Sequence, residues 1–170
     1  MWNLTGKKRP PFAETPSDGQ ESVWDYPRPP SLRPDPRRVE VKSDGRLIAS
    51  SNRTVRICET ASPPTFYIPP EDVNRDLLSA LDSSSYCEWK GTASYWGLQS
   101  KPGAGPVGWS YARPRHPFVK ITDYVSFYPG RVECHVDGER VRPQPGGFYG
   151  GWITDEIIGP FKGEPGTGHW

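Results

Sequence analysis

The sequence predicts a mainly β domain built of short antiparallel strands and hairpins, with one short helix. Three observations predict this class. Short runs of β-type residues are separated by turn residues, and Asp44-Gly45 and Asp137-Gly138 are strong hairpin signals. Only residues 70–81 show the apolar spacing of a convincing helix. The 170 residues include 7 Trp, 8 Tyr and 6 Phe, whose large apolar side chains favour a folded core over disorder.

Composition divides the chain into three parts. Residues 1–37 carry eight of the 21 prolines and few aliphatic side chains, so we expect an arm without a strand ladder. Trp24 and Tyr26 are costly to leave in water and are expected to dock this arm on the body. Residues 38–141 carry the β-type pattern and form the predicted β domain. Residues 142–170 are rich in glycine and proline and are predicted to wrap the sheet as a tail.

Hairpins and single strands account for much of the predicted domain. Residues 38–49 and 131–141 each flank an Asp-Gly turn and are predicted to form hairpins. Residues 54–59 alternate between apolar and polar, and a regular pleat carries Glu59 inward behind two apolar side chains. Residues 65–68 are predicted to form a brief further strand.

The middle of the chain combines the predicted helix with two longer strands. Residues 70–81 place apolar side chains at i, i+4 and i+8, behind prolines and acids of the kind that begin a helix. Residues 86–96 are predicted to form one strand, on which strict alternation puts Cys87 and Lys90 on opposite faces. Residues 119–128 show the clearest alternation in the chain and predict another strand.

Charge and hydropathy exclude several classes of protein. Lys and Arg number 21 against 20 Asp and Glu, and a formal net charge of +1 argues against a general nucleic-acid binder. No apolar run exceeds three residues, so neither a membrane span nor a signal peptide is expected.

The cysteines indicate free thiols. Cys58, Cys87 and Cys134 form no CxxC pair and are accompanied by 3 His, which argues against a structural zinc site. Free thiols fit a reducing compartment, so we expect a cytoplasmic location and predict neither a metal nor a cofactor.

The order of the segments resembles the bacterial and fungal domain-of-unknown-function family 427, also catalogued under a nucleotidyltransferase-9 label. The most specific matching motif is Cys-x-x-Lys-Gly-x-Ala-x-Tyr at residues 87–95, and the resemblance covers about residues 38–141. The other matching segments are Arg38-Val39 with the Asp-Gly hairpin, Cys58-Glu59, residues 63–69 with Asp72-Val73, Trp109-Ser110-Tyr111 and residues 125–128.

The resemblance implies a compact domain of the β-tent kind. This architecture is similar to methionine sulfoxide reductase B and to the thalidomide-binding domain of cereblon, which bind small ligands between sheets. The chain departs from the family pattern at Glu88, where members commonly carry proline. Nucleotidyl transfer normally needs clustered carboxylates for Mg²⁺. The candidates, Glu71-Asp72 and Asp155-Glu156, are typical of helix starts and turns, so metal-dependent nucleotidyl transfer is disfavoured.

Three candidate catalytic residues lie in or beside the matching segments, each with a structural alternative. Glu59 is a candidate acid/base or ligand acceptor. Its structural alternative is a buried carboxylate in an ion pair with Lys90 or Arg56, or hydrogen-bonded to a tyrosine hydroxyl. Cys87 is a candidate nucleophile, or a small buried hydrophobic residue. Lys90 is a candidate anion contact, or a solvated lysine on a sheet face.

Four aromatic residues complete the predicted site. Tyr67, Tyr95, Trp109 and Tyr111 are expected to line a small-molecule pocket, with core packing as the alternative.

Two functions remain open from the sequence. The first is a small-molecule pocket, in an enzyme or a binding protein, for a small polar or anionic metabolite. The second is a non-catalytic interaction domain whose aromatic arm and tail form a partner or homodimer surface. Neither a nucleic-acid nor a membrane partner is expected.

Overall fold

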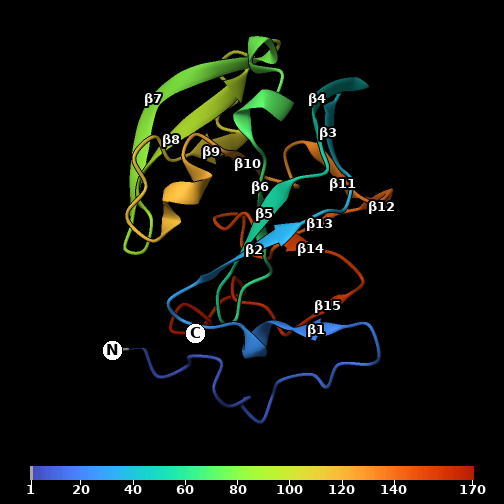
Figure 1. Cartoon of the computed structure of the whole chain (residues 1–170), viewed down its shortest axis with the longest axis vertical. Coiled ribbons are helices and arrows are strands. Elements are labelled where there is room, and N and C mark those ends of the chain that lie inside the picture. Colours follow the sequence, from blue (N-terminus) through green and yellow to red (C-terminus); the bar gives the residue numbers. More distant parts are fainter. Residues whose placement is uncertain (1) are drawn as a thin grey trace.

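Short strands in several small sheets make up the fold, as the sequence predicts. The computed structural model describes residues 2–170 and is mainly β (Figure 1). A three-stranded sheet has the order β2 (Ser31–Asp35), β5 (Thr54–Cys58), β6 (Thr65–Tyr67). One four-stranded sheet has the order β12 (Glu139–Arg140), β11 (Glu133–Val136), β3 (Val39–Ser43), β4 (Arg46–Ser51). The other has the order β10 (Val125–Phe127), β9 (Gly108–Ser110), β8 (Gly91–Leu98), β7 (Leu78–Cys87).

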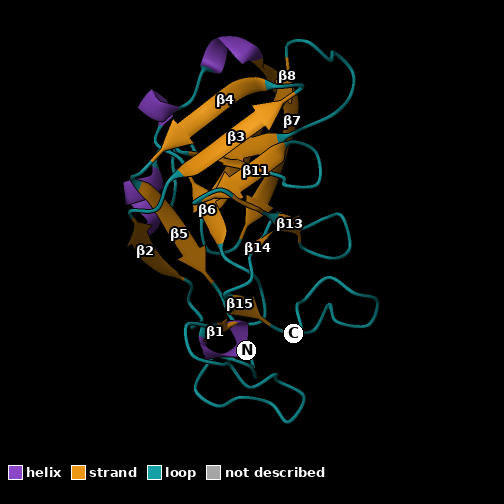
Figure 2. Ribbon diagram, turned by 90° about the vertical axis from the view of Figure 1, so that its right-hand side faces the viewer, coloured by secondary structure: helices purple, strands orange, loops and turns teal. Residues whose placement is uncertain are grey.

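Two small strand pairs belong to the ends of the chain. Strands β13 (Arg142–Pro143) and β14 (Trp152–Ile153) are antiparallel, whereas β1 (Glu21–Ser22) and β15 (Ile157–Ile158) are parallel. Figure 2 shows the layer of β3, β4 and β11 at one end of the molecule and the β1–β15 pair at the other, close to both chain ends. Within residues 2–170, no helix is long and apolar enough to cross a membrane.

The two predicted Asp-Gly hairpins are confirmed. Strands β3 and β4 meet at Asp44-Gly45, and β11 and β12 meet at Asp137-Gly138. All four turn residues have a positive φ, between 48° and 82°, as the tight turns that match the twist of paired strands require. The hairpins then join to each other, because β3 and β11 pair antiparallel with Val41 opposite Cys134.

The predicted helix over residues 70–81 is wrong. Residues 70–77 form two 3-10 helices, η2 (Pro70–Asp72) and η3 (Arg75–Leu77), and β7 begins at Leu78. The segment between the two 3-10 helices is extended and forms a bridge to strand β4. Val73 bridges to Ala49, and the Asn74 amide donates to the Ile48 carbonyl oxygen at 2.7 Å. The helical spacing therefore arises from apolar residues that reach the core from separate short elements.

Two predicted strands were also too long. Residues 86–96 contain a turn at 88–90 that separates β7 from β8, and Cys87 pairs with Gly91 across it. In the other, residues 118–121 form the 3-10 helix η4 (Phe118–Ile121), so only β10 remains of the expected strand. The alternation over residues 119–128 predicts that Val119 faces the core, but in η4 this residue is 53% exposed.

The N-terminal arm contributes more to the fold than its composition predicts. The expectation of no strand ladder is wrong, because β2 pairs with β5 over five residues. The expected docking is confirmed, since Trp24 and Tyr26 are buried. Trp24 lies in the 3-10 helix η1 (Val23–Asp25), and its ring centre is 5.1 Å from that of Trp170 at the other end of the chain. The arm and the tail therefore share one apolar cluster.

Two further apolar clusters hold the sheets together. The larger lies under the hairpin layer and includes Trp152, whose ring stacks 4.8 Å from that of Phe66 and whose Nε1 donates to a β10 carbonyl. The other includes Ile57, Tyr67 and Trp109 and joins the three-stranded sheet to the β7–β10 sheet. This second cluster positions the aromatic residues of the site described below.

Candidate functional site

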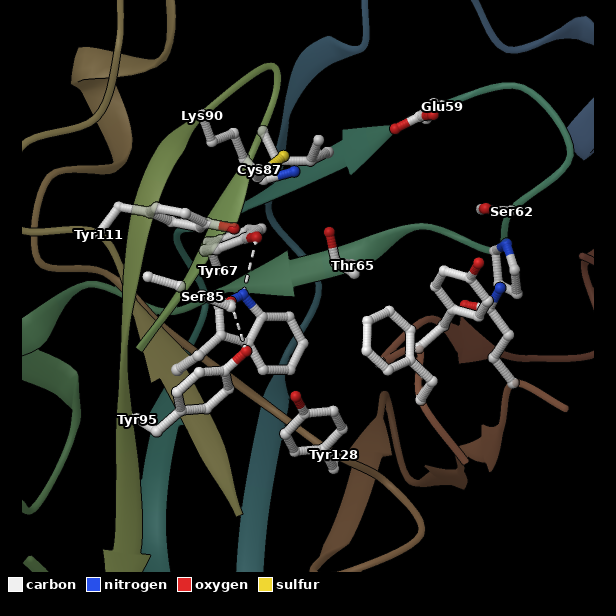
Figure 3. Close-up of a pocket in the computed structure, with 18 of the residues that line it drawn as sticks. Glu59, Ser62, Thr65, Tyr67, Ser85, Cys87, Lys90, Tyr95, Tyr111 and Tyr128 are labelled. Carbon is white, nitrogen blue, oxygen red and sulfur yellow. Dashed lines mark hydrogen bonds between the residues drawn. The ribbon is translucent and has the colours of Figure 1, made fainter. Parts of the chain in front are cut away.

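One cavity brings together all seven candidate residues from the sequence. It has a volume of about 390 Å³ and lies where the end of β5 and strand β6 face the β7–β9 strands (Figure 3). The seven residues among those that line it are Glu59, Tyr67, Cys87, Lys90, Tyr95, Trp109 and Tyr111.

Lys90 is the buried cation of this cavity. It is the last residue of the turn between β7 and β8, and the Arg115 amide fixes that turn by donating to the Lys90 carbonyl at 2.9 Å. The side chain is only 9% exposed, and its ammonium lies 5.8 Å from the centre of the Tyr111 ring. Burial lowers the pKa of Lys90, but the neighbouring Tyr67, Cys87 and Glu59 raise it by more. The net pKa is raised, so Lys90 stays an ammonium at neutral pH.

The β7–β8 turn also brings Cys87 to the same end of the cavity. The prediction that Cys87 and Lys90 lie on opposite faces is wrong, because the chain reverses between them (Figure 3). Cys87 is partly exposed, whereas Cys58 and Cys134 are fully buried. Burial raises the pKa of Cys58 to about 11. Of the three free thiols, Cys87 is therefore the one that faces a cavity.

Glu59 follows β5 and lies at the edge of the cavity, paired with a residue that the sequence analysis did not consider. Its Oε2 accepts a hydrogen bond from Arg28 Nε at 3.0 Å, so the expected partners Lys90, Arg56 or a tyrosine were wrong. The Arg28 side chain is 1% exposed. The structural alternative of an ion pair thus describes Glu59 well, although the carboxylate still borders the cavity.

Hydroxyl groups and one indole form the polar part of the walls. Trp109 Nε1 donates to the Tyr67 hydroxyl at 3.1 Å, and the hydroxyls of Ser85 and Tyr95 lie 2.6 Å apart. Burial is the main reason that the pKa of Tyr111 is raised, and burial together with Tyr95 raises the pKa of Tyr128 to about 12. Tyr111 and Tyr128 therefore stay protonated at neutral pH and can donate hydrogen bonds.

The charges around the cavity are unbalanced in favour of cations. Lys90 and Arg131 line it, and Glu59 is the only carboxylate among the lining residues. The Arg131 guanidinium stacks 4.2 Å from the Tyr128 ring centre and donates to the Pro106 carbonyl at 2.6 Å. Because Glu59 already pairs with Arg28, the groups left free to meet a ligand are mainly donors.

The structure also limits where a metal ion would bind. Among residues 2–170, no three or more His, Cys, Asp or Glu side chains lie close enough together to hold one.

The family assignment agrees with the suspected resemblance. A family model described as Domain of unknown function (DUF427), labelled NTP_transf_9, matches residues 31–138. The chain belongs to the DUF427 family. The match starts with β2 and includes all seven candidate residues. No curated protein matches the chain.

A part of the cavity lies outside the DUF427 match and was missed by the sequence analysis. We call residues 146–151, Gly-Gly-Phe-Tyr-Gly-Gly, the aromatic strap. Within it, Gly147, Phe148, Tyr149 and Gly150 line the cavity. Gln144 fixes the base of the strap, since its Oε1 accepts from the Gly151 amide at 3.0 Å.

Close packing explains why the strap needs glycine. A Cβ at position 150 would lie 2.6 Å from Trp109 Cζ3, so only glycine lets the backbone approach that ring. Two glycine pairs around two aromatic residues were the sequence signal for this segment. The other lining residues that the sequence analysis did not select are Ile57, Ser62, Pro63, Thr65, Ser85, Tyr86, Ala93, Tyr128, Arg131 and Gln144.

Proposed function

We propose that this DUF427 protein binds a small anionic molecule in the cavity, with Lys90 as the contact to the anionic group. The observation that carries the proposal is that Lys90 is nine-tenths buried at the cavity wall and pairs with no carboxylate in residues 2–170. A buried ammonium needs an anion or several acceptors to offset the loss of water. A bound carboxylate or phosphate group would supply both.

Size and lining support a small molecule as the ligand. Cavities of about 300 to 1,000 Å³ lined by aromatic groups with a few polar groups are typical of small-molecule sites, and this one has about 390 Å³. In the proposal Tyr67, Tyr95, Trp109 and Tyr111 are the walls that hold the body of the ligand. The family resemblance implies a β-tent architecture. This likeness supports the proposal, because proteins of that kind bind ligands between sheets.

A cationic ligand is the main competitor, because aromatic cages also bind quaternary ammonium groups. Here the chain's own cations already occupy two of the rings. Lys90 lies over Tyr111, and Arg131 lies over Tyr128. A second positive charge would meet repulsion from both, so the proposal favours an anion.

The test is to titrate small carboxylates and inorganic phosphate into the wild-type chain and into Lys90→Met, followed by NMR or calorimetry. Lys90→Met keeps most of the side-chain volume but removes the charge, and we expect affinity to fall at least about tenfold, the equivalent of one charged hydrogen bond. Lys120→Met is the matched control, since Lys120 is exposed and does not line the cavity. Equal affinities of the wild-type chain and Lys90→Met would overturn the proposal.

A catalytic role is the second candidate, and the position of Cys87 beside Lys90 favours it. A neighbouring ammonium stabilises a thiolate, which is the nucleophilic form of cysteine. The thiolate would attack an electrophilic carbon of the bound anion, and a sulfur–carbon bond would form as the leaving group departs with its electron pair. Glu59 would serve this candidate as acid/base or ligand acceptor at the cavity edge.

Alkylation by iodoacetamide, read by mass spectrometry, tests the catalytic candidate. Cys58 and Cys134 are internal controls because both are buried. We expect Cys87 to react first in the native chain and to react more slowly in Lys90→Met. Equal reactivity of Cys87 with and without the lysine charge would contradict the activation of this thiol.

A further inference from the structure

The aromatic strap places an uncovered ring at the cavity. Phe148 lines the cavity and is nevertheless 78% exposed. Its ring meets Tyr149 edge-on, with ring centres 5.0 Å apart and planes at 88°. The other exposed aromatic residue that lines the cavity is Tyr86, at 68%. Because both rings line the cavity, each leaves an aromatic surface on which a bound ligand can pack.

Tyr149 is held more firmly than Phe148. The Lys162 ammonium lies 5.5 Å from the Tyr149 ring centre. The base of the strap is fixed by Gln144, which is buried and bonded to both the Gly151 amide and the Lys162 carbonyl oxygen. Phe148 is therefore carried on an anchored segment, and apart from its edge-on contact with Tyr149 its ring is open to solvent.

The rest of the cavity repeats this aromatic character and adds a charge. Lys90 lies nine-tenths buried in the wall without a carboxylate partner in residues 2–170. Flat aromatic rings gain affinity from offset or edge-on contacts with other rings, beyond the burial of area. A ligand that combines a negative group with a flat ring would satisfy both features of the lining at once.

We infer that the ligand class is the planar aromatic acids, with the acid group at Lys90 and the ring covered by Phe148 of the strap. This inference rests on the proposed anion binding and names its substrate class. Residues 146–151 lie beyond the matched range 31–138, so the strap would add ring selectivity to an anion site carried by the family region.

Benzoate and cyclohexanecarboxylate form the test pair, because they share the carboxylate and differ in having a flat or a puckered ring. Titrations followed by NMR are expected to give benzoate an affinity about three- to tenfold higher, the range that one aromatic contact supplies. Phe148→Leu keeps an apolar side chain without the ring and should bring the ratio of the benzoate affinity to the cyclohexanecarboxylate affinity down to about one. Phe12→Leu is the control, since Phe12 is another exposed phenylalanine that does not line the cavity.

The outcomes separate the inference from the proposed function. If the wild-type chain binds both acids equally, and Lys90→Met weakens both, the ring selectivity is overturned and the anion site stands. If the preference for benzoate survives in Phe148→Leu, the role of the strap is overturned. If neither acid binds the wild-type chain, the inference fails, and the titration of inorganic phosphate into the wild-type chain and Lys90→Met decides the proposed function separately.

Discussion

Arg28 offers the sharpest test of what holds the edge of the site. Its buried guanidinium donates four hydrogen bonds of 2.9 to 3.0 Å. One goes to Glu59, and the others go to carbonyl oxygens of Leu4, Thr60 and Trp170. Arg28→Met therefore leaves the Glu59 carboxylate and the main-chain oxygens of Leu4 and Thr60 without this donor, whereas the Trp170 oxygen keeps Lys162 Nζ at 3.2 Å. Each buried acceptor left unsatisfied costs about 1 to 3 kcal/mol, so we expect the free energy of unfolding to fall by about 3 to 5 kcal/mol in total.

Glu59→Gln is the matched change on the other side of the pair. The Glu59 side chain is 26% exposed, and glutamine keeps an oxygen that can accept from Arg28. Because the guanidinium also retains its three carbonyl partners, we expect a smaller loss, about 1 kcal/mol.

Denaturation by urea, with both single variants and the double variant, measures these energies and their coupling. At 170 residues, each 1 kcal/mol shifts the melting temperature by about 2 to 4 °C, so Arg28→Met should melt roughly 10 °C lower. The same Glu59→Gln protein should retain anion binding if the main task of Glu59 is to hold Arg28. If Glu59→Gln is as unstable as Arg28→Met, the expected difference between the two sides of the ion pair is refuted. If Glu59→Gln is stable but no longer binds the anion, Glu59 contacts the ligand directly.

Three further predictions test the packing and the titrations. Gly150→Ala forces a Cβ against Trp109 and should lower the free energy of unfolding by about 1 to 3 kcal/mol. Gly168→Ala meets nothing within 4 Å and should change stability little in the same denaturation experiment, so equal effects of the two changes would contradict the close approach. Benzoate affinity should stay constant from about pH 7 to 9, because the raised pKa of Lys90 keeps its ammonium charged. A decline within that range by NMR titration would show that Lys90 loses its proton too early for the proposed role. Burial raises the pKa of Glu21, but hydrogen bonds from a guanidinium and a tyrosine hydroxyl lower it by more. The stability that Glu21 contributes should therefore be complete above its ordinary pKa of 4.5 and be lost as the pH falls through the lower folded-state value. Glu21→Gln should remove that part of the acid dependence, and an unchanged acid profile by thermal melting would contradict it.

Local chemistry made the hairpins of the fold predictable. An Asp-Gly pair favours the positive φ angles that a tight turn needs, whatever the rest of the chain does. The apolar spacing of residues 70–81 was misleading because a period of 3.6 only shows which side chains are buried, not that one helix buries them. Of the three residues with this spacing, Val73 is buried on an extended bridge, whereas Leu77 in η3 and Leu81 in β7 are half-buried. Tertiary contacts with Ile48 and Ala49 decided this segment.

The arm was underestimated for a different reason. Proline at position 34 argues against a central strand, but β2 lies at the edge of its sheet, where a missing donor on the outer side costs little. Composition does not show which side of a strand will face solvent. Composition also gives no sign of the role of Arg28, because its partners Glu59 and Trp170 lie 31 and 142 residues away in the sequence.

All seven candidate residues line one cavity, but the sequence did not predict how they are arranged in it. Alternation along residues 86–96 continues unchanged through the turn at 88–90, so the pattern alone does not show that the chain reverses there. Gly91, at φ +102°, was the local sign of the reversal, since few other residues adopt that conformation. The reversal puts Cys87 and Lys90 at one end of the cavity instead of on opposite faces of a strand. The proposed nucleophile and the proposed anion contact can then reach one ligand, which a flat strand would have prevented.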